Sequence, residues 1–274
     1  MLPAPAKLNL FLHVIGRRSD GYHTIESLFV PVSFGDSVSL ALRDDGSVVG
    51  APIAGVDEER DLSVRAARLL QRETGVKHGV DIAIVKRLPI GGGLGGGSSD
   101  AATVLLGLNL LWRLKLPRSE LMRIGLALGA DVPFFIFGEP ALARGVGELL
   151  APMSAPPTWF VVLTPPVAVS TASVFAAPEL TRNSVSAKIA VFSEGYGRND
   201  LQAAASARYP AIAEHVDLLR REGEPRMTGS GACVFALYRS EQQARHALSA
   251  LPPETAAFVA RALGRHPLWT FATP

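Results

Sequence analysis

The segment LPIGGGLGGGSSDAATVLLGLN, residues 88–109, places a run of glycines directly before a stretch of helical character. Six of the seven residues from Gly91 to Gly97 are glycines, and two serines follow them. The first backbone N–H groups of a helix have no partner within it, and the helix dipole adds partial positive charge there. Glycines remove the Cβ atoms that would hold the backbone away from an anion, and they permit positive φ. The segment therefore predicts a loop that binds a polyphosphate.

The spacing of this loop excludes one other interpretation and leaves two open. A Walker A loop needs a lysine where Ser98 stands, so that interpretation is rejected. Gly91, Gly93 and Gly96 satisfy the dinucleotide pattern GxGxxG. That fold also needs an acid at a strand end about twenty residues on, whereas Glu120 falls in a predicted helix. A plain turn is a further alternative, although so many glycines are unfavourable in chain entropy. The dinucleotide and plain-turn alternatives stay open on the residues alone.

Two charges stand in apolar surroundings far apart in the sequence. Lys7 and Asn9 interrupt the apolar pattern of APAKLNLFL, and Asp131 interrupts GADVPFFIFG. Either charge would be unfavourable to bury alone, so we expect a Lys7–Asp131 ion pair. The pair would place a cation and a carboxylate beside the phosphates, but a purely structural ion pair fits the residues equally well. A second glycine-rich loop, in MTGSGACVFAL at 227–237, is also consistent with an ordinary turn.

Periodicity predicts the elements that position these residues. Leu8, Leu10 and Leu12 alternate as in a strand, and Asp61 and Gly75 suit the start and stop of a helix. Strands are expected at 5–15, 36–42, 80–88, 160–164, within a loop-and-strand segment at 227–238, and at 256–262. Helices are expected at 61–73, 99–112, 119–128 and 240–251. Strand, tight loop and helix thus follow one another around the glycines, in a mixed α and β chain.

Composition excludes several function classes. The chain has 274 residues, 48% hydrophobic, with a net charge of +2, so it can form one large or two ordinary domains. Its scattered basic residues argue against a nucleic-acid partner, and no apolar run approaches a membrane span. The single cysteine, Cys233, excludes a disulfide framework and a cysteine-rich zinc site, and its apolar neighbours predict a buried thiol. We expect no membrane association and a cytoplasmic location.

Three motifs in this order resemble those of the GHMP kinases, named for galactokinase, homoserine kinase, mevalonate kinase and phosphomevalonate kinase. They are PAKLNLFL near the start, PIGGGLGGGSSDAA at 89–102 and MTGSGACVF at 227–235. The segments RSDGYHTIESLF, GADVPFF, GVGE and NDLQ are similar to one branch of that family, whose alcohol substrate carries cytidine diphosphate. The resemblance runs from Pro5 to about Leu237 and is weakest at 43–60 and 182–198.

The resemblance implies an α+β fold of two domains with the active site in the cleft between them. Residues 1–152 would form a ribosomal-protein-S5-like ATP-binding domain, and residues 153–274 a ferredoxin-like domain on the substrate side. Three prolines in residues 151–159 independently favour a boundary there. The partner would be a small-molecule cytidine diphosphate substrate, and the chain a monomer or weak homodimer.

The resemblance also assigns roles in a kinase that transfers the ATP γ-phosphoryl to the 2-hydroxyl of a methylerythritol unit. Lys7 and Asp131 would be catalytic. The ATP site would comprise Lys86, Pro89, Gly91, Gly92, Gly93, Leu94, Gly95, Gly96, Gly97, Ser98 and Ser99. The substrate site would comprise Asn9, Tyr22, His23, Thr171, Phe175, Thr228, Gly229, Ser230 and Gly231. Mg²⁺ is expected on the phosphates, with its protein ligands unknown and Ser99 the one candidate.

A tyrosine next to a histidine in the loop SDGYHT suits a flat heteroaromatic ring, although such a pair also packs locally in many loops. The resemblance places cytosine between Tyr22 and Phe175, with His23 at the edge that distinguishes cytosine from uracil. Two alternatives stay open: another GHMP kinase such as a homoserine kinase, and a non-catalytic nucleotide-binding protein on this fold. The first gives no reason for the Tyr-His pair, and the second would be expected to lose Lys7 or Asp131.

Overall fold

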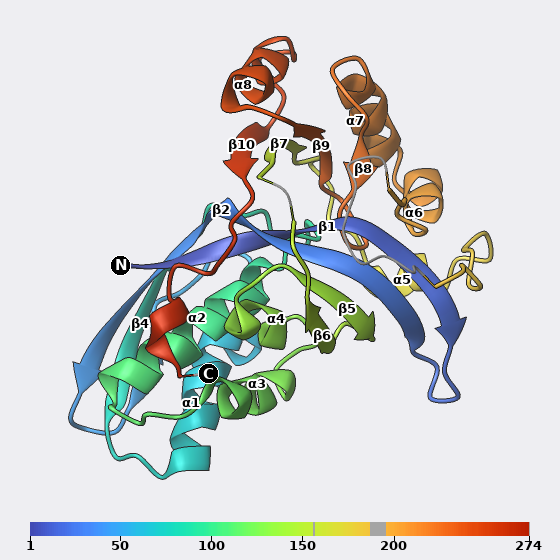
Figure 1. Cartoon of the computed structure of the whole chain (residues 1–274). Helices are drawn as coiled ribbons and strands as arrows, with labels where there is room; N and C mark the ends of the chain where they lie inside the picture. Colours follow the sequence, from blue (N-terminus) through green and yellow to red (C-terminus); the bar gives the residue numbers. More distant parts are fainter. Residues whose placement is uncertain (156, 187–195, 274) are drawn as a thin grey trace.

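The computed structural model describes residues 1–155, 157–186 and 196–273. It has two lobes, each built on one sheet (Figure 1). In the first lobe the strand order is β3-β4-β2-β5-β6, and β1 pairs with β2. In the second lobe the order is β10-β7-β9-β8. All of these pairings are antiparallel except that of β3 with β4. The predicted α+β class is confirmed.

The first lobe contains six strands and four α-helices among the described residues. The strands are β1 (Leu2–Arg17), β2 (His23–Arg43), β3 (Val48–Gly50), β4 (Gly79–Val85), β5 (Ala141–Gly145) and β6 (Leu149–Pro152). The helices are α1 (Leu62–Thr74), α2 (Gly96–Leu111), α3 (Arg118–Leu126) and α4 (Val132–Phe137), with the short 3-10 helix η1 (Glu58–Arg60).

The second lobe follows along the chain and lies against β1 and β2 in Figure 1. Its strands are β7 (Trp159–Leu163), β8 (Arg226–Met227), β9 (Val234–Tyr238) and β10 (Ala257–Arg261). Its helices are α5 (Thr171–Phe175), α6 (Gln202–Arg208), α7 (Pro210–Arg220) and α8 (Glu241–Ser249). The 3-10 helix η2 (Trp269–Phe271) is the last element.

Strand β1 is buried on both faces because it lies between the two lobes. Leu8 and Leu10 pack into a core shared with Phe160 and Phe235 of the second sheet. Alternation turns Lys7 to the opposite face, where its ammonium lies over the Phe29 ring, before the register shifts between Asn9 and Leu12. The predicted strand at 5–15 is confirmed and is longer at both ends. This strand therefore positions a lysine at the seam between the lobes.

The predicted helices are confirmed within a few residues. Asp61 caps α1 by accepting a hydrogen bond from the N–H of Ser63 at 2.8 Å, and Gly75 ends it in the left-handed conformation. Helix α2 starts at Gly96, three residues before the predicted start at Ser99. Glycine is a poor helix former, so propensity alone places the start too late.

Some strands were not predicted. Only residues 36–42 of the long strand β2 were predicted, because its first half is buried on both faces and shows no simple alternation. Strands β5 and β6 were missed as well. The predicted segment at 227–238 contains β8 and β9 with a loop between them. Cys233 is buried as predicted, and desolvation raises the pKa of its thiol to about 12.

The last residues of the chain return to the first lobe. After β10, the N–H of Leu263 donates to the carbonyl of Pro31 at 2.8 Å, and the N–H of His266 donates to the carbonyl of Gly138 at 2.7 Å. Figure 1 accordingly shows the C-terminus beside the helices of the first lobe. The second lobe is therefore connected to the first lobe at both its N-terminal and its C-terminal end. The domain boundary between residues 152 and 153 stays a prediction.

Candidate functional site

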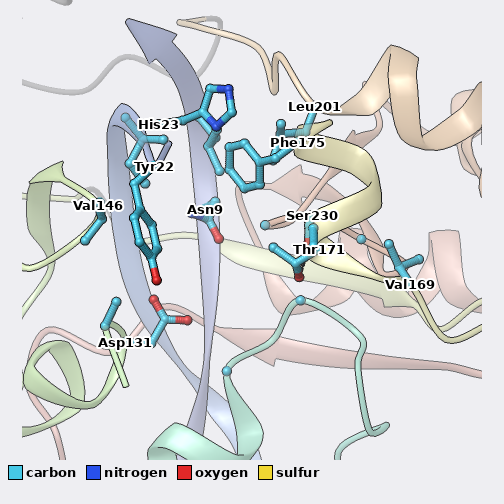
Figure 2. A pocket seen from close by; sticks show the side chains of 18 of the residues that line it. Asn9, Tyr22, His23, Asp131, Val146, Val169, Thr171, Phe175, Leu201 and Ser230 are labelled. Carbon is cyan, nitrogen blue, oxygen red and sulfur yellow. Dashed lines mark hydrogen bonds between the residues drawn. The ribbon is translucent and has the colours of Figure 1, made fainter. Parts of the chain in front are cut away.

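A cavity of about 950 Å³ lies between the two lobes. Its walls come from β1, the start of β2, the glycine loop (residues 89–99), the start of α4, α5 and the Gly-Ser-Gly loop (residues 228–231) (Figure 2). The predicted site residues that line it are Lys7, Asn9, Tyr22, His23, Gly91, Gly93, Gly95, Asp131, Thr171, Phe175, Gly229, Ser230 and Gly231. Segments from across the sequence therefore converge on one cavity.

The glycine loop has the backbone that its composition predicts. Gly91, Gly93 and Gly95 all have positive φ, a conformation that side chains disfavour. A Cβ atom on Gly93 would lie 2.4 Å from the carbonyl oxygen of Thr228, and one on Gly95 would lie 2.9 Å from the Phe135 ring. Helix α2 begins within this segment, at Gly96, so the first N–H groups of the helix lack intrahelical acceptors. Such a helix start can bind an anion.

Backbone hydrogen bonds tie the glycine loop to both lobes. The N–H of Lys7 donates to the carbonyl of Leu94 at 2.9 Å, and the N–H of Cys233 donates to the carbonyl of Gly92 at 3.1 Å. The hydroxyl of Ser99 is fully buried and donates to the carbonyl of Pro5 at 2.7 Å. The proton of this hydroxyl is therefore engaged by the backbone, and the role of Ser99 as a metal ligand stays a prediction.

The predicted ion pair between Lys7 and Asp131 is present. Lys7 Nζ lies 3.3 Å from Asp131 Oδ1, with 4% of the lysine side chain and 34% of the aspartate side chain exposed. The ammonium also donates to Asn9 Oδ1 at 3.3 Å and lies 3.8 Å from the centroid of the Phe29 ring. Asp131 precedes α4 without capping it, so its carboxylate is free to face the cavity. A buried cation thus stands beside a carboxylate that solvent and ligands can reach.

Thr228 supports the site from behind the cavity wall. Its hydroxyl accepts a hydrogen bond from the N–H of Asn9 at 3.0 Å and donates to Asn9 Oδ1 at 3.2 Å. The Asn9 amide also donates to Ser27 Oγ at 2.9 Å. Thr228 is fully buried and does not line the cavity. Thr228 therefore positions Asn9, its contact with substrate stays a prediction, and residues 229–231 line the cavity.

Lys86 is held by two buried carboxylates at the base of the glycine loop. Its ammonium bonds Asp36 and, at 2.7 Å, Asp100 of α2. Asp36 also accepts the N–H of Leu88 at 2.8 Å. Desolvation raises the pKa of Asp100 to about 7, and its Oδ1 has no hydrogen-bond partner. Lys86 and Pro89 lie outside the lining of the cavity, so their contact with adenosine stays a prediction.

Aromatic rings gather at the opposite end of the cavity, the base end. The His23 and Phe175 rings stack with centroids 5.0 Å apart and an interplanar angle of 26°. Tyr22 is 66% exposed, and Figure 2 shows its hydroxyl directed toward the Asp131 carboxylate. Desolvation lowers the pKa of His23, and the charges of Arg182 and Arg17 act in the same direction. Three rings from two lobes therefore border this end.

Some residues that build the site carried little signal in the sequence. Asn199 donates to the carbonyls of Met227 at 2.7 Å and Gly229 at 2.8 Å, and so holds the Gly-Ser-Gly loop. It belongs to the NDLQ segment, where the family resemblance gave the only clue. Thr171 and Ser230 share a hydrogen bond of 2.7 Å between their hydroxyls, which joins α5 to the same loop.

No metal-binding group of three or more His, Cys, Asp or Glu side chains occurs among residues 1–155, 157–186 and 196–273. Within the same residues, no helix combines the length and the apolar character that a membrane crossing requires.

Comparisons with known proteins match this geometry. The GHMP kinases N terminal domain matches residues 61–139, and the GHMP kinases C terminal domain matches residues 177–257. The 4-diphosphocytidyl-2-C-methyl-D-erythritol kinase of Thiobacillus denitrificans is 59% identical over 98% of this chain and 97% of its own.

Solved structures support the same assignment. A crystal structure of 4-(cytidine 5'-diphospho)-2C-methyl-D-erythritol kinase has a TM-score of 0.85 at 36% identity, covering 96% of this chain and 98% of its own. A homoserine kinase from Cytophaga hutchinsonii has a TM-score of 0.66 at 16% identity over 96% of this chain and 93% of its own, which shows the shared fold alone. The chain therefore belongs to the 4-diphosphocytidyl-2-C-methyl-D-erythritol kinase family of the GHMP kinases.

Proposed function

We propose that this chain phosphorylates 4-diphosphocytidyl-2-C-methyl-D-erythritol on its 2-hydroxyl, with ATP as the phosphoryl donor. The observation that carries the proposal is the Lys7–Asp131 pair, which lies in one cavity between a glycine loop and a group of aromatic rings. If the ATP phosphates bind at one end of the cavity and the base of the substrate at the other, the alcohol of the substrate lies beside Lys7 and Asp131. This step belongs to the non-mevalonate route to isoprenoid precursors.

Phosphoryl transfer needs mainly positioning and charge neutralisation. The start of α2 and the glycine loop hold the ATP phosphates through backbone N–H groups. Asp131 orients the attacking hydroxyl and accepts its proton, since its carboxylate is accessible and caps no helix. The Lys7 ammonium, fixed by Asn9 and Asp131, stabilises the negative charge that develops on the transferred phosphoryl.

Mg²⁺ fits this site as a companion of ATP. The residues that border the phosphates offer one accessible carboxylate, Asp131, and the hydroxyl of Ser99 is engaged by Pro5. Mg²⁺ commonly binds substrate phosphates, waters and only one or two carboxylates. When bound, it would neutralise charge on the β- and γ-phosphates.

The base end accounts for the cytidine portion of the substrate. Tyr22 and Phe175 reach the cavity from different lobes and offer ring faces for stacking, which tolerates any base. Discrimination between bases then requires hydrogen bonds to the edge of the base. His23 lines this end of the cavity, and its ring nitrogens can form such bonds. We propose that these residues bind cytosine.

A coupled assay of ADP release tests the proposed function. The purified chain with ATP and Mg²⁺ should release ADP with 4-diphosphocytidyl-2-C-methyl-D-erythritol, and should show no more than background release with homoserine or mevalonate. Phosphorus NMR of the product should show a new monophosphate ester beside an intact diphosphate. Turnover with homoserine but not with the cytidine compound would overturn the proposal.

A further inference from the structure

Arg182 borders the base end of the cavity, and the mechanism above gives it no role. Its Nε donates to Nε2 of His23 at 3.2 Å. Its terminal nitrogens donate to the carbonyls of Leu180 at 3.1 Å, Phe175 at 3.0 Å and Ala177 at 2.7 Å. These carbonyls belong to the end of α5 and the turn after it. The guanidinium is therefore fixed by the second lobe and holds a ring that the first lobe supplies.

The Arg182 contact sets the protonation of the histidine ring. A guanidinium has only donors and keeps its charge in proteins, so the ring nitrogen that faces it must carry a lone pair. A neutral imidazole with its lone pair on Nε2 carries its proton on Nδ1. Burial and the neighbouring charges of Arg182 and Arg17 lower the pKa of His23, which favours this neutral ring.

The remaining ring nitrogen is then a donor of fixed identity. Among the hydrogen bonds of the described residues, none occupies Nδ1 of His23, and this residue lines the cavity. Cytosine has a lone pair on N3, whereas uracil has a hydrogen there. A fixed N–H donor can therefore bond to cytosine N3. Opposite uracil it would face another N–H, and both buried donors would be left unsatisfied.

We infer that Arg182 is a positioning residue that determines base specificity, because it holds His23 as an Nδ1–H donor toward the cytosine edge. This inference rests on the proposed function, since it assigns a base-selecting role at the same site. Arg182 acts through His23 and needs no contact with the base. Loss of the Nε–Nε2 hydrogen bond lets the ring exchange its proton between the two nitrogens and accept from uracil N3–H.

Arg182→Met tests the inference because methionine keeps much of the stem and removes every donor. We expect kcat/KM for the cytidine substrate relative to its uridine analogue to fall about tenfold. Nitrogen-15 NMR of the free protein should show His23 moving from the Nδ1–H form to a mixture of tautomers. Arg182→Lys keeps a charged donor, so it should restore part of the discrimination between the two nucleotides and part of the Nδ1–H form of His23. Arg17→Met is the charge control: it removes the neighbouring charge, keeps the ring hydrogen bond, and should leave the tautomer unchanged.

Three results would overturn the role of Arg182. One is a rise in KM by the same factor for both nucleotides with the His23 tautomer unchanged, as expected if Arg182 only braces α5. Another is a tautomer change in Arg17→Met equal to that in Arg182→Met. The third comes from the His23→Ala background, where Arg182→Met should reduce discrimination no further; an undiminished loss there contradicts action through His23. If the wild-type chain turns over neither nucleotide, the proposed function itself fails. The NMR measurement needs no substrate, so it still tests the role of Arg182 separately.

Discussion

The two ends of the cavity are built from different parts of the chain. At the phosphate end the backbone of the glycine loop forms the wall, and hydrogen bonds from Lys7 and Cys233 hold it from both lobes. At the base end side chains form the wall: an exposed tyrosine, a histidine, and Phe175 on a helix of five residues. We therefore expect added atoms to disrupt the phosphate end, whereas the base end should be disrupted by the removal of side chains.

The proposed catalytic pair, Lys7 and Asp131, lies between these ends, and its loss should have the largest effect. Asp131→Asn keeps the shape and removes the charge, so we expect kcat to fall by about 10²–10⁴-fold with ATP affinity nearly unchanged. Steady-state kinetics and calorimetric titration with ATP measure the two quantities. Normal turnover in a variant that melts much earlier would make the pair structural and not catalytic.

Gly93→Ala tests whether the phosphate end tolerates an added methyl group. The new Cβ would lie 2.4 Å from the Thr228 carbonyl at a residue with positive φ, so the two loops must separate. We expect the KM for ATP to rise about tenfold or more and the Tm to fall by several degrees, since such strain costs about 1–3 kcal/mol.

The matched control is Gly97→Ala in the first turn of α2. There the nearest atom to a new Cβ is a flexible leucine methyl at 3.6 Å, and helix propensity favours alanine. The Tm of Gly97→Ala should stay the same or rise. Equal losses of Tm in both variants would show that any side chain in this loop is harmful, regardless of the contact with residues 228–231.

Tyr22→Ala tests the base end by removing a ring. We expect the KM for the cytidine substrate to rise about tenfold, since stacking contributes about 1–3 kcal/mol per base, with the KM for ATP nearly unchanged. Stability should hardly change because the side chain is mostly exposed. Equal losses toward ATP and the cytidine substrate would place Tyr22 outside the base site and remove the contrast between the two ends.

The smallest expected effect concerns stability alone and involves Asp100, which bonds Lys86 at the base of the glycine loop. Burial raises the pKa of Asp100 from 3.8 to about 7, so the folded protein binds this proton more tightly than the unfolded chain does. Ionised Asp100 therefore lowers the free energy of unfolding progressively between about pH 4 and pH 7. Asp100→Asn should match the wild-type Tm near pH 4 and exceed it by a few degrees at pH 8. A difference in Tm that is independent of pH would contradict this origin.

Local signals in the sequence predicted one end of the site better than the other. The glycine loop was predicted because a helix start after glycines has one strong physical use, and its positive φ values agree. The Lys7–Asp131 pair was predicted because neither charge is tolerated alone in an apolar segment. Nothing in the sequence indicated that the Ser99 hydroxyl bonds the Pro5 carbonyl or that the Thr228 hydroxyl bonds Asn9, because both partners are remote along the chain.

The resemblance to a known family supplied what periodicity could not. It identified Tyr22 and Phe175 as partners although 152 positions separate them, and both do line one cavity. It gave no indication of Arg182, which stands at the start of a segment where the resemblance is weak. The first half of β2 was missed because a strand buried on both faces loses the alternation that reveals strands.

The amino-acid sequence alone was enough to predict the α+β class, the glycine loop at the start of a helix and the pairing of two isolated charges. These follow from local backbone preference and from the high free energy of an unpaired buried charge. Only the tertiary structure decided which face of β1 meets the second lobe, which hydroxyls are already bonded, and that Arg182 fixes the His23 ring. Each of these depends on contacts between segments that are far apart in the sequence, and such contacts leave no local pattern of residues.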